Sequence, residues 1–326
     1  MPVTQKMIAQ RCEVSVSAVA DILGKRSHLF NARTRDRVIN TARELGYRPS
    51  RWARAVRTGR LGAVGLLAVD FRHFPWDALN GIEDVLSSRA LHALCLRLTN
   101  QGGASFLSER MADGMIVSCD LSPQLISLVE QHSVPSVWLN DKRTADCVYC
   151  DDRAGMRNAA ERLMQLGHRR IVYVDYSVSA HYSSEDRCAG YLEAMRAAGL
   201  ASRVIRQRMP RLERVAFTRD WLSGPQRPTA VLAYSDSSAY PVLHCAVAVL
   251  GLRVPQDLSL VTVDNQVDDR MGLVIATVME PQYAMGEAVA RMILARMDKP
   301  GQRQAPQSFV PTFEPGQTCC PAPAGA

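Results

Sequence analysis

The sequence predicts an all-α head of about sixty residues, followed by an α/β body built on parallel sheets. Three observations support this fold class. Residues 1–60 carry 13 of the 39 Lys and Arg residues but only 4 of the 32 Asp and Glu residues. A turn-and-helix pattern occupies residues 14–19, and apolar runs alternate with amphipathic segments after residue 61. A basic head on a near-neutral body is typical of a protein that binds duplex nucleic acid through a separate module.

Length and composition are those of a globular protein with two or three domains. The chain has 326 residues, of which 47% are hydrophobic and 22% charged. No apolar run reaches the roughly 18 to 20 residues that a membrane span needs. The first residues lack the apolar stretch of a secretory signal. We therefore expect a cytoplasmic protein that makes no contact with a membrane.

The nine cysteines are odd in number and scattered, so we expect reduced thiols. Cys147 and Cys150 form a C-x-x-C pair, but no second pair and no H-x-x-x-H motif accompanies it. A zinc site needs four ligands, or three and a water molecule. The sequence therefore predicts neither a metal site nor a cofactor.

The head divides into three short helices. Thr4 is placed to cap a helix that ends near residue 11, and Ser15 to cap a second that ends near residue 23. Asn31 or Thr34 starts a third helix, which Gly46 ends. These signals predict a compact trio in which the second helix follows a tight turn.

The second helix has one apolar and one outward face. Val19 and Ile22 recur at helical spacing and predict the buried side. Val16, Ser17 and Asp21 then point outward. Small residues at the start of a helix suit the major groove, because bulky side chains would block close approach to base edges.

A short basic segment follows the trio. Pro49 breaks the chain and Ser50 can cap one or two helical turns, in which Trp52 and Val56 share a face between arginines. So short a helix needs a partner. The segment is either a minor-groove wedge or a basic linker between domains.

The body repeats a strand-and-helix alternation. Helical spacing marks residues 78–88 and 125–131. Short apolar runs typical of buried strands lie at residues 63–69, 92–98, 114–117, 136–139, 171–174, 230–233 and 258–263. Some 250 residues of this pattern suit two α/β units better than one.

Over residues 3–56 the head resembles the DNA-binding head of the LacI/GalR family of bacterial transcription regulators. The resemblance rests on V-S-x-x-x-V at 14–19, T-R-x-x-V at 34–38, and L-G-Y-x-P at 45–49 with the basic segment after it. It implies base readout by Val16, Ser17 and Asp21. It also implies minor-groove contacts by Trp52, Ala53 and Val56, and backbone contacts by Thr4, Ser15, Arg33, Arg51, Arg54 and Arg57.

Asp21 and Val56 depart from the family pattern, which usually has Arg and Leu at these two places. A carboxylate can only accept a hydrogen bond from the amino group of cytosine or adenine. The alternative role of Asp21 is a salt bridge or a contact with the N-terminal arm. The smaller Val56 predicts a shallower wedge.

The body resembles the effector domain of the same family, a type I periplasmic-binding-protein-like fold of two doubly wound parallel lobes. The phrases are L-G-H-R-R-I-V-Y-V at 166–174, R-C-A-G-Y at 187–191, R-P-T-A-V-L-A-Y-S-D at 227–236 and V-P-Q-D-L-S-L-V-T-V-D-N at 254–265. The resemblance implies a small ligand between the lobes, beyond the carboxyl ends of the strands. The implied ligand residues are Arg187, Asp264, Asp236, Asn140, Ser235, Glu280 and Trp138.

An arginine with carboxylates suits a hydroxyl-rich neutral ligand such as a sugar, since donors and acceptors are both presented. Each candidate also has a structural alternative. Asp236 can cap a helix, Arg187 can tether one by a salt bridge, and Trp138 can belong to the core.

These observations predict four segments: a DNA-binding domain at 1–48, a hinge at 49–60, a two-lobed effector and dimerisation domain at 61–313, and a disordered tail at 314–326. The expected function is a homodimeric, nucleoid-associated repressor whose affinity for a pseudo-palindromic operator is switched by a sugar-like effector. An effector-independent or activating regulator is the alternative.

Two other classes of protein are disfavoured. The sequence holds no G-x-G-x-x-G, G-x-x-x-x-G-K or G-x-S-x-G motif for an enzyme. The basic head argues against an extracytoplasmic solute-binding protein.

Overall fold

The computed structural model describes residues 3–24, 26–48, 59–69, 74–98, 111–118, 123–131, 134–224, 226–263 and 272–323. The chain forms two compact units, Met1–Leu61 and Gly62–Ala326. No helix in the described ranges is long and apolar enough to cross a membrane. The predicted hinge residues Arg51, Trp52, Ala53, Arg54, Val56 and Arg57 lie outside the described residues, and so does Asp264.

The first unit holds the predicted helical trio. Its elements are α1 (Gln5–Arg11), α2 (Val16–Ile22), a 3₁₀ turn (Ser27–Leu29) and α3 (Ala32–Glu44). The side chains of Thr4, Ser15 and Asn31 cap the three helices. Gly46, with φ +67°, follows the end of α3. The core of this unit is formed by Ile8, Ala9, Cys12, Val19, Ile22, Val38 and Ala42. The predicted helices and caps are therefore confirmed, with Asn31 rather than Thr34 starting α3.

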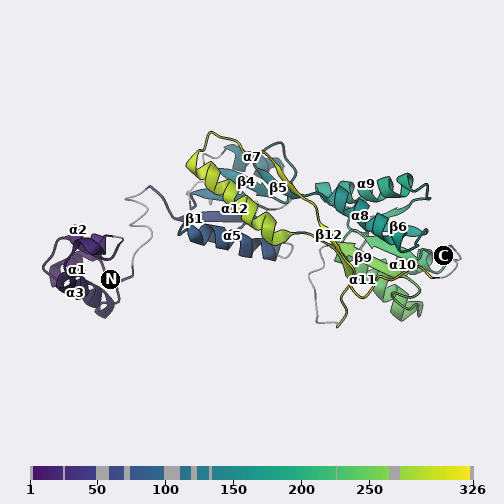
Figure 1. Cartoon of the computed structure of the whole chain (residues 1–326), viewed down its shortest axis with the longest axis horizontal. Coiled ribbons are helices and arrows are strands. Elements are labelled where there is room, and N and C mark those ends of the chain that lie inside the picture. The colour runs from purple at the N-terminus through teal and green to yellow at the C-terminus, as the bar shows by residue number, and fades with distance from the viewer. Residues whose placement is uncertain are drawn as a thin grey trace. The chain divides into compact units, whose positions relative to one another are not determined.

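The second unit contains two sheets, which we call the N-lobe and C-lobe sheets (Figure 1). The N-lobe sheet has the order β11-β5-β4-β3-β1-β2, and all of its pairings are parallel. Its strands are β1 (Ala63–Ala68), β2 (His92–Arg97), β3 (Gly114–Val117), β4 (Ser136–Leu139), β5 (Cys147–Cys150) and β11 (Gln307–Phe309). Helices α5 (Trp76–Ser88) and α12 (Gln282–Asp298) pack on one face, and α7 (Pro123–Gln131) on the other.

The C-lobe sheet has the order β12-β10-β9-β8-β6-β7, and only the β10–β12 pair is antiparallel. Its strands are β6 (Ile171–Asp175), β7 (Arg203–Arg206), β8 (Ala230–Ala233), β9 (Ser259–Val263), β10 (Ala276–Met279) and β12 (Thr312–Glu314). Helices α8 (Asp152–Gln165) and α9 (Tyr182–Ala197) cover one face. Helices α10 (Arg214–Leu222) and α11 (Asp236–His244), continued by a π-helical turn (Cys245–Val249), cover the other. Both lobes are doubly wound, as predicted.

The chain passes between the two lobes three times. It leaves the N-lobe after β5 to enter α8, returns after β10 to enter α12, and leaves again between β11 and β12. These crossover segments place Asp152 and Glu280 next to each other in space although 128 positions separate them.

Two helix pairs approach closely because glycine stands at the point of contact. A Cβ on Gly286 of α12 would lie 2.1 Å from the carbonyl oxygen of Ala78 in α5. A Cβ on Gly190 of α9 would lie 2.1 Å from the carbonyl oxygen of Arg153 in α8. Both contacts are to backbone, which cannot move aside without shifting a helix.

Gly190→Ala is therefore expected to push α9 away from α8 and to lower the free energy of unfolding by about 1–3 kcal/mol. Gly224→Ala is the matched control, because a Cβ there meets no heavy atom within 4 Å. Chemical denaturation of the full-length variants measures both. Equal stability of the two variants would contradict the close approach of the helices.

Helix α11 contains Pro241, which cannot donate to the carbonyl of Ser237 one turn earlier. Arg214 replaces the missing donor: its Nη1 lies 2.7 Å from that carbonyl oxygen. The replacement keeps the first turn of α11 intact and fixes Ser237 beside the carboxyl ends of β6 and β8.

The tail differs from the prediction of disorder at 314–326. Thr318 is fully buried, and its hydroxyl donates to the carbonyl of Leu260 at 2.6 Å and accepts from the amide of Ala276 at 2.9 Å. The amide of Ala322 donates to the carbonyl of Leu166. The prediction was wrong for residues 314–323, because backbone groups of a Pro- and Gly-containing segment can be bound by strands distant in sequence.

Candidate functional site

The outward face of α2 is exposed to solvent. Val16 is 46% exposed and Ser17 is exposed, whereas Val19 and Ile22 are buried in the head core. Ser15 accepts from the amide of Ala18 at 3.1 Å and shares a hydrogen bond with the Ser17 hydroxyl at 2.9 Å. The structure thus presents two small side chains at the start of α2, in the orientation that the sequence predicts. Thr4 and Arg33, two of the predicted backbone contacts, are also exposed.

Asp21, at the end of α2, forms a salt bridge with an arginine in the turn that follows the helix. Its carboxylate lies 2.6 Å from the guanidinium of Arg26, whose side chain is 67% exposed. The salt bridge named as the alternative role of Asp21 is therefore present. The sequence signal for this salt bridge was a pair of opposite charges five positions apart, separated by the turn after α2.

We expect Asp21→Asn to leave the preferred DNA sequence unchanged, because Arg26 already occupies the carboxylate. Affinity for all duplexes should rise slightly, since a negative charge beside the phosphates is removed. Binding to a randomised duplex library measures both. A changed preference at one base pair would instead assign Asp21 to base readout.

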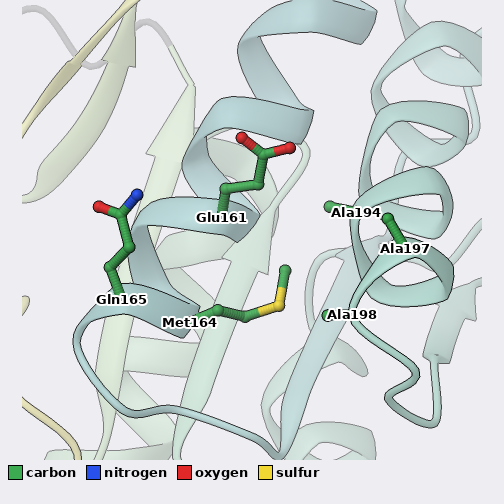
Figure 2. Close-up of a pocket in the computed structure, with 6 residues that line it drawn as sticks. All are labelled: Glu161, Met164, Gln165, Ala194, Ala197 and Ala198. Atoms are coloured by element: carbon green, nitrogen blue, oxygen red, sulfur yellow. The ribbon is translucent and has the colours of Figure 1, made fainter.

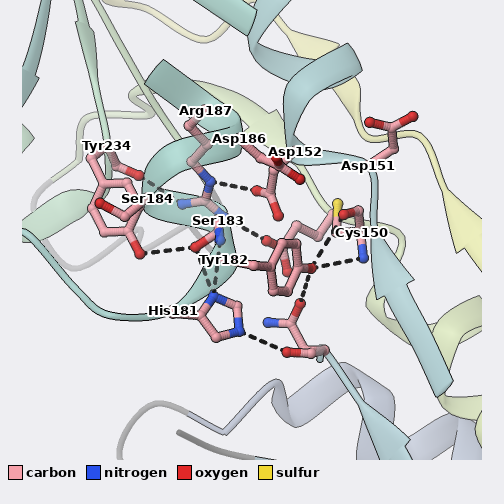
Figure 3. A network of polar contacts seen from close by, with 12 residues as sticks. Cys150, Asp151, Asp152, His181, Tyr182, Ser183, Ser184, Asp186, Arg187 and Tyr234 are labelled. Atoms are coloured by element: carbon pink, nitrogen blue, oxygen red, sulfur yellow. Dashed lines mark hydrogen bonds and ion pairs between the residues drawn. The ribbon is translucent and has the colours of Figure 1, made fainter. Parts of the chain in front are cut away.

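A polar cluster lies where the chain crosses between the lobes (Figure 3). At its centre is Arg187 of α9, which is 7% exposed. The guanidinium donates through Nε to Asp152, through Nη1 to the carbonyl of Tyr234 at 2.7 Å, and through Nη2 to Glu280 at 2.8 Å. The Arg187 guanidinium also lies 4.9 Å from the centre of the Tyr234 ring. Arg187 therefore ties both crossover segments, at the starts of α8 and α12, to α9.

The cluster holds two buried carboxylates for one guanidinium. Burial is the main cause that raises the pKa of Glu280 to about 7; Arg187 opposes this rise and the nearby Asp152 adds to it. One oxygen of Asp152, Oδ2, is buried without a hydrogen-bond partner among the described residues. Asp152 was not among the predicted ligand residues. Its position just after a buried strand was the only sequence signal that it belongs to this cluster.

The first turn of α9 reaches the N-lobe through Asn140, which follows β4 with φ +56°. The carbonyl of Asn140 lies 2.7 Å from Nε2 of His181, and its side-chain oxygen accepts from the hydroxyl of Tyr182 at 3.0 Å. Lys142 forms an ion pair with Asp186 of α9 at 2.8 Å. Both oxygens of Asn140 are thus engaged, so its amide NH₂ group is what it can offer to a ligand.

Hydroxyl groups gather at the carboxyl ends of β6, β8 and β9. Ser235 and Ser237 share a hydrogen bond at 2.9 Å, and Ser237 shares another with Ser177 at 2.9 Å. Asp236, in the first turn of α11, accepts from Thr262 at 3.1 Å. The edge therefore offers both donors and acceptors to a ligand.

Of the predicted effector residues, Arg187 and Glu280 form an ion pair, and Ser235 and Asp236 lie at the start of α11. Trp138 is different: it is 4% exposed and packs in the N-lobe core, with the guanidinium of Arg143 centred 3.3 Å from its ring. Trp138 is therefore a core residue, which is the alternative role that the sequence offered for it.

A groove of about 440 Å³ lies between the C-terminal halves of α8 and α9 (Figure 2). Its walls are formed by Glu161, Met164, Gln165, Ala194, Ala197 and Ala198. One carboxylate and one amide give it few polar groups to orient a ligand. The polar cluster lies at the opposite ends of the same helices, so this groove is not part of it.

Known proteins are similar to this chain in sequence. Residues 160–319 match a family described as a periplasmic binding protein-like domain. The chain is 29% identical to the HTH-type transcriptional repressor PurR of Erwinia tasmaniensis, over 95% of each chain.

Solved structures share the fold. The Lac repressor dimer bound to operator and the anti-inducer ONPF superposes with a TM-score of 0.83 at 20% identity, over 98% of this chain and 100% of that one. The complex of the transcriptional regulator CelR with cellobiose gives a TM-score of 0.70 at 22% identity, over 97% and 100%. The chain therefore shares its fold, a helix-turn-helix head and two doubly wound lobes, with these transcriptional regulators, and it is similar to PurR in sequence along nearly its whole length.

Proposed function

We propose that this protein is a ligand-responsive transcriptional repressor that binds a specific operator through its head and a sugar-like metabolite between its two lobes. The observation that carries the proposal is the exposed start of α2, where Val16 and Ser17 project from a strongly basic unit joined to a two-lobed body. The names of the relatives, a transcriptional repressor and an operator-bound dimer, support it.

We assign residues 1–48 to DNA binding, 49–60 to the hinge, and 61–323 to effector binding and dimerisation. A two-fold dimer presents two heads in opposite orientation, which makes a pseudo-palindromic operator the geometric expectation. The protein acts on chromosomal DNA in the cytoplasm, and catalysis forms no part of the proposal.

The ligand class follows from the groups at the carboxyl ends of the strands. Ser235, Asp236 and the amide of Asn140 present donors and acceptors without a net positive charge. Arg187 has its charge balanced by two carboxylates. Neutral, hydroxyl-rich molecules fit such a set, and the CelR–cellobiose complex is a structural neighbour with a ligand of this kind.

The operator is tested with full-length protein and a random duplex library. We expect two half-sites related by a two-fold axis, and a shifted preference for Ser17→Ala because Ser17 is exposed at the start of α2. Recovery of no common sequence, or of single half-sites alone, would contradict the proposal.

The effector is tested by thermal shift with sugars, sugar phosphates, polyols and nucleobases. One ligand should raise Tm and change operator affinity, and Ser235→Ala should weaken its binding. Ser223→Ala, on the end of α10, is the matched control. Operator binding that no tested ligand alters would favour the effector-independent regulator.

A further inference from the structure

Three metal-ligating side chains meet at the crossover segments. Cys150 ends β5, Asp152 begins α8, and Glu280 lies between β10 and α12. All three are buried, and one ligand atom from each lies within 4.8 Å of the others. A single ion can therefore reach all three after small side-chain adjustments.

The C-x-x-C spacing does not produce this arrangement. Cys147 and Cys150 lie three positions apart on one strand, so their side chains point to opposite faces of the sheet. Cys147 packs with the α7 side of the N-lobe core, and Cys150 with the α5 and α12 side. The partners of Cys150 come from other segments of the chain, which sequence spacing could not indicate.

The unpartnered oxygen of Asp152 points to a ligand. Its side chain is 2% exposed, and Oδ2 makes no hydrogen bond among the described residues. A buried carboxylate oxygen without a partner is unfavourable, and native proteins rarely leave one. Arg187 contacts Oδ1 of Asp152 and Oε1 of Glu280, which leaves the second oxygen of each carboxylate.

The charges in the cluster match a divalent cation. Arg187 supplies one positive charge against the two carboxylates. Binding of a metal deprotonates a cysteine ligand, so Cys150 would add a third negative charge. Three negative ligands and one positive guanidinium leave two negative charges, which one divalent cation neutralises.

We propose that Cys150, Asp152 and Glu280 form a site for a zinc-class divalent cation. One thiolate and two carboxylates suit Zn²⁺ or Cd²⁺, whereas Mg²⁺ and Ca²⁺ prefer oxygen ligands alone. Three protein ligands leave a fourth position for water or another donor. The ion would join the start of α8 to the start of α12 and so restrain the lobes relative to each other. The site stands whether or not the proposed operator and effector are correct.

The test is a titration of reduced, full-length protein with Cd²⁺, followed by the ultraviolet thiolate-to-cadmium absorption band. One equivalent should bind, and an excess of Zn²⁺ should abolish the band. Cys150→Ser should remove the band, and Asp152→Asn should weaken binding at least about tenfold. Circular dichroism and Tm establish that each variant is folded.

Matched controls change cysteines that lie outside the proposed site. Cys95→Ser removes an exposed cysteine, and the double change Cys319→Ser with Cys320→Ser removes the pair in the tail. Both should bind Cd²⁺ as the parent does. A band that survives Cys150→Ser, or that disappears in either control, would overturn the proposal.

A measurement on the parent protein needs no variant. X-ray absorption at the cadmium edge should show one sulfur ligand with the remainder oxygen. Two or more sulfur ligands would place the ion elsewhere, and absence of stoichiometric binding would exclude the site.

Discussion

Deletion of residues 1–60 is expected to abolish sequence-specific operator binding while leaving the body folded. The head core and the exposed face of α2 both lie within the deleted segment. Among the described residues, the four hydrophobic clusters of the body contain no residue before Val64. The loss of affinity for the selected operator should be at least about a thousand-fold, the usual margin of specific over non-specific binding.

The measurement is fluorescence anisotropy with the operator recovered by the full-length protein, and Tm reports the state of the body. A point variant tests the same claim without removing the head, because it disrupts the fold of the head and leaves the chain at full length. Val19→Asp places a carboxylate at a fully buried position of the head and should abolish operator binding to the same degree. Specific binding by the truncated protein would show that another part of the chain recognises the operator.

Arg187→Ala is expected to lower the free energy of unfolding of the body by about 3–5 kcal/mol. The change leaves Asp152 and Glu280 buried without the guanidinium that compensates both carboxylates. It also removes the donor to the carbonyl of Tyr234. The cost comes chiefly from the charges left behind, since a complete ion pair in a protein interior contributes little net stability.

This explanation predicts a rescue. Arg187→Met combined with Asp152→Asn and Glu280→Gln removes all three charges and should recover most of the lost stability. Arg89→Ala breaks an exposed pair with Asp298 and should change stability by less than about 0.5 kcal/mol. Calorimetric unfolding of the full chain measures each variant. A triple variant no more stable than Arg187→Ala would mean that packing, and not charge, dominates at this position.

The same result bears on effector experiments. Arg187 is both a predicted ligand residue and the tie between two crossover segments. Loss of effector binding in Arg187→Ala would therefore not distinguish contact with the ligand from loss of the local structure. Ser235 is better suited, since its hydroxyl bonds to that of Ser237 beside the first turn of α11.

Several structural features of this protein can be predicted from local sequence. Thr4, Ser15 and Gly46 mark helix ends because a cap is a contact between residues at most a few positions apart. Val19 and Ile22 face the head core because helical periodicity sets the buried side. The strands of both lobes are continuous apolar runs because parallel strands are covered on both faces.

Sequence thus determined the helical head, the two doubly wound lobes and the outward side chains of α2, all of which depend on short-range periodicity and capping. Tertiary structure alone decided the rest. It bonds Arg187 to residues 35 and 93 positions away, and it packs Thr318 between two strands. It also sets Cys150 beside Asp152 and Glu280. Such contacts depend on where the chain crosses between the lobes, and no local pattern of residues encodes that position.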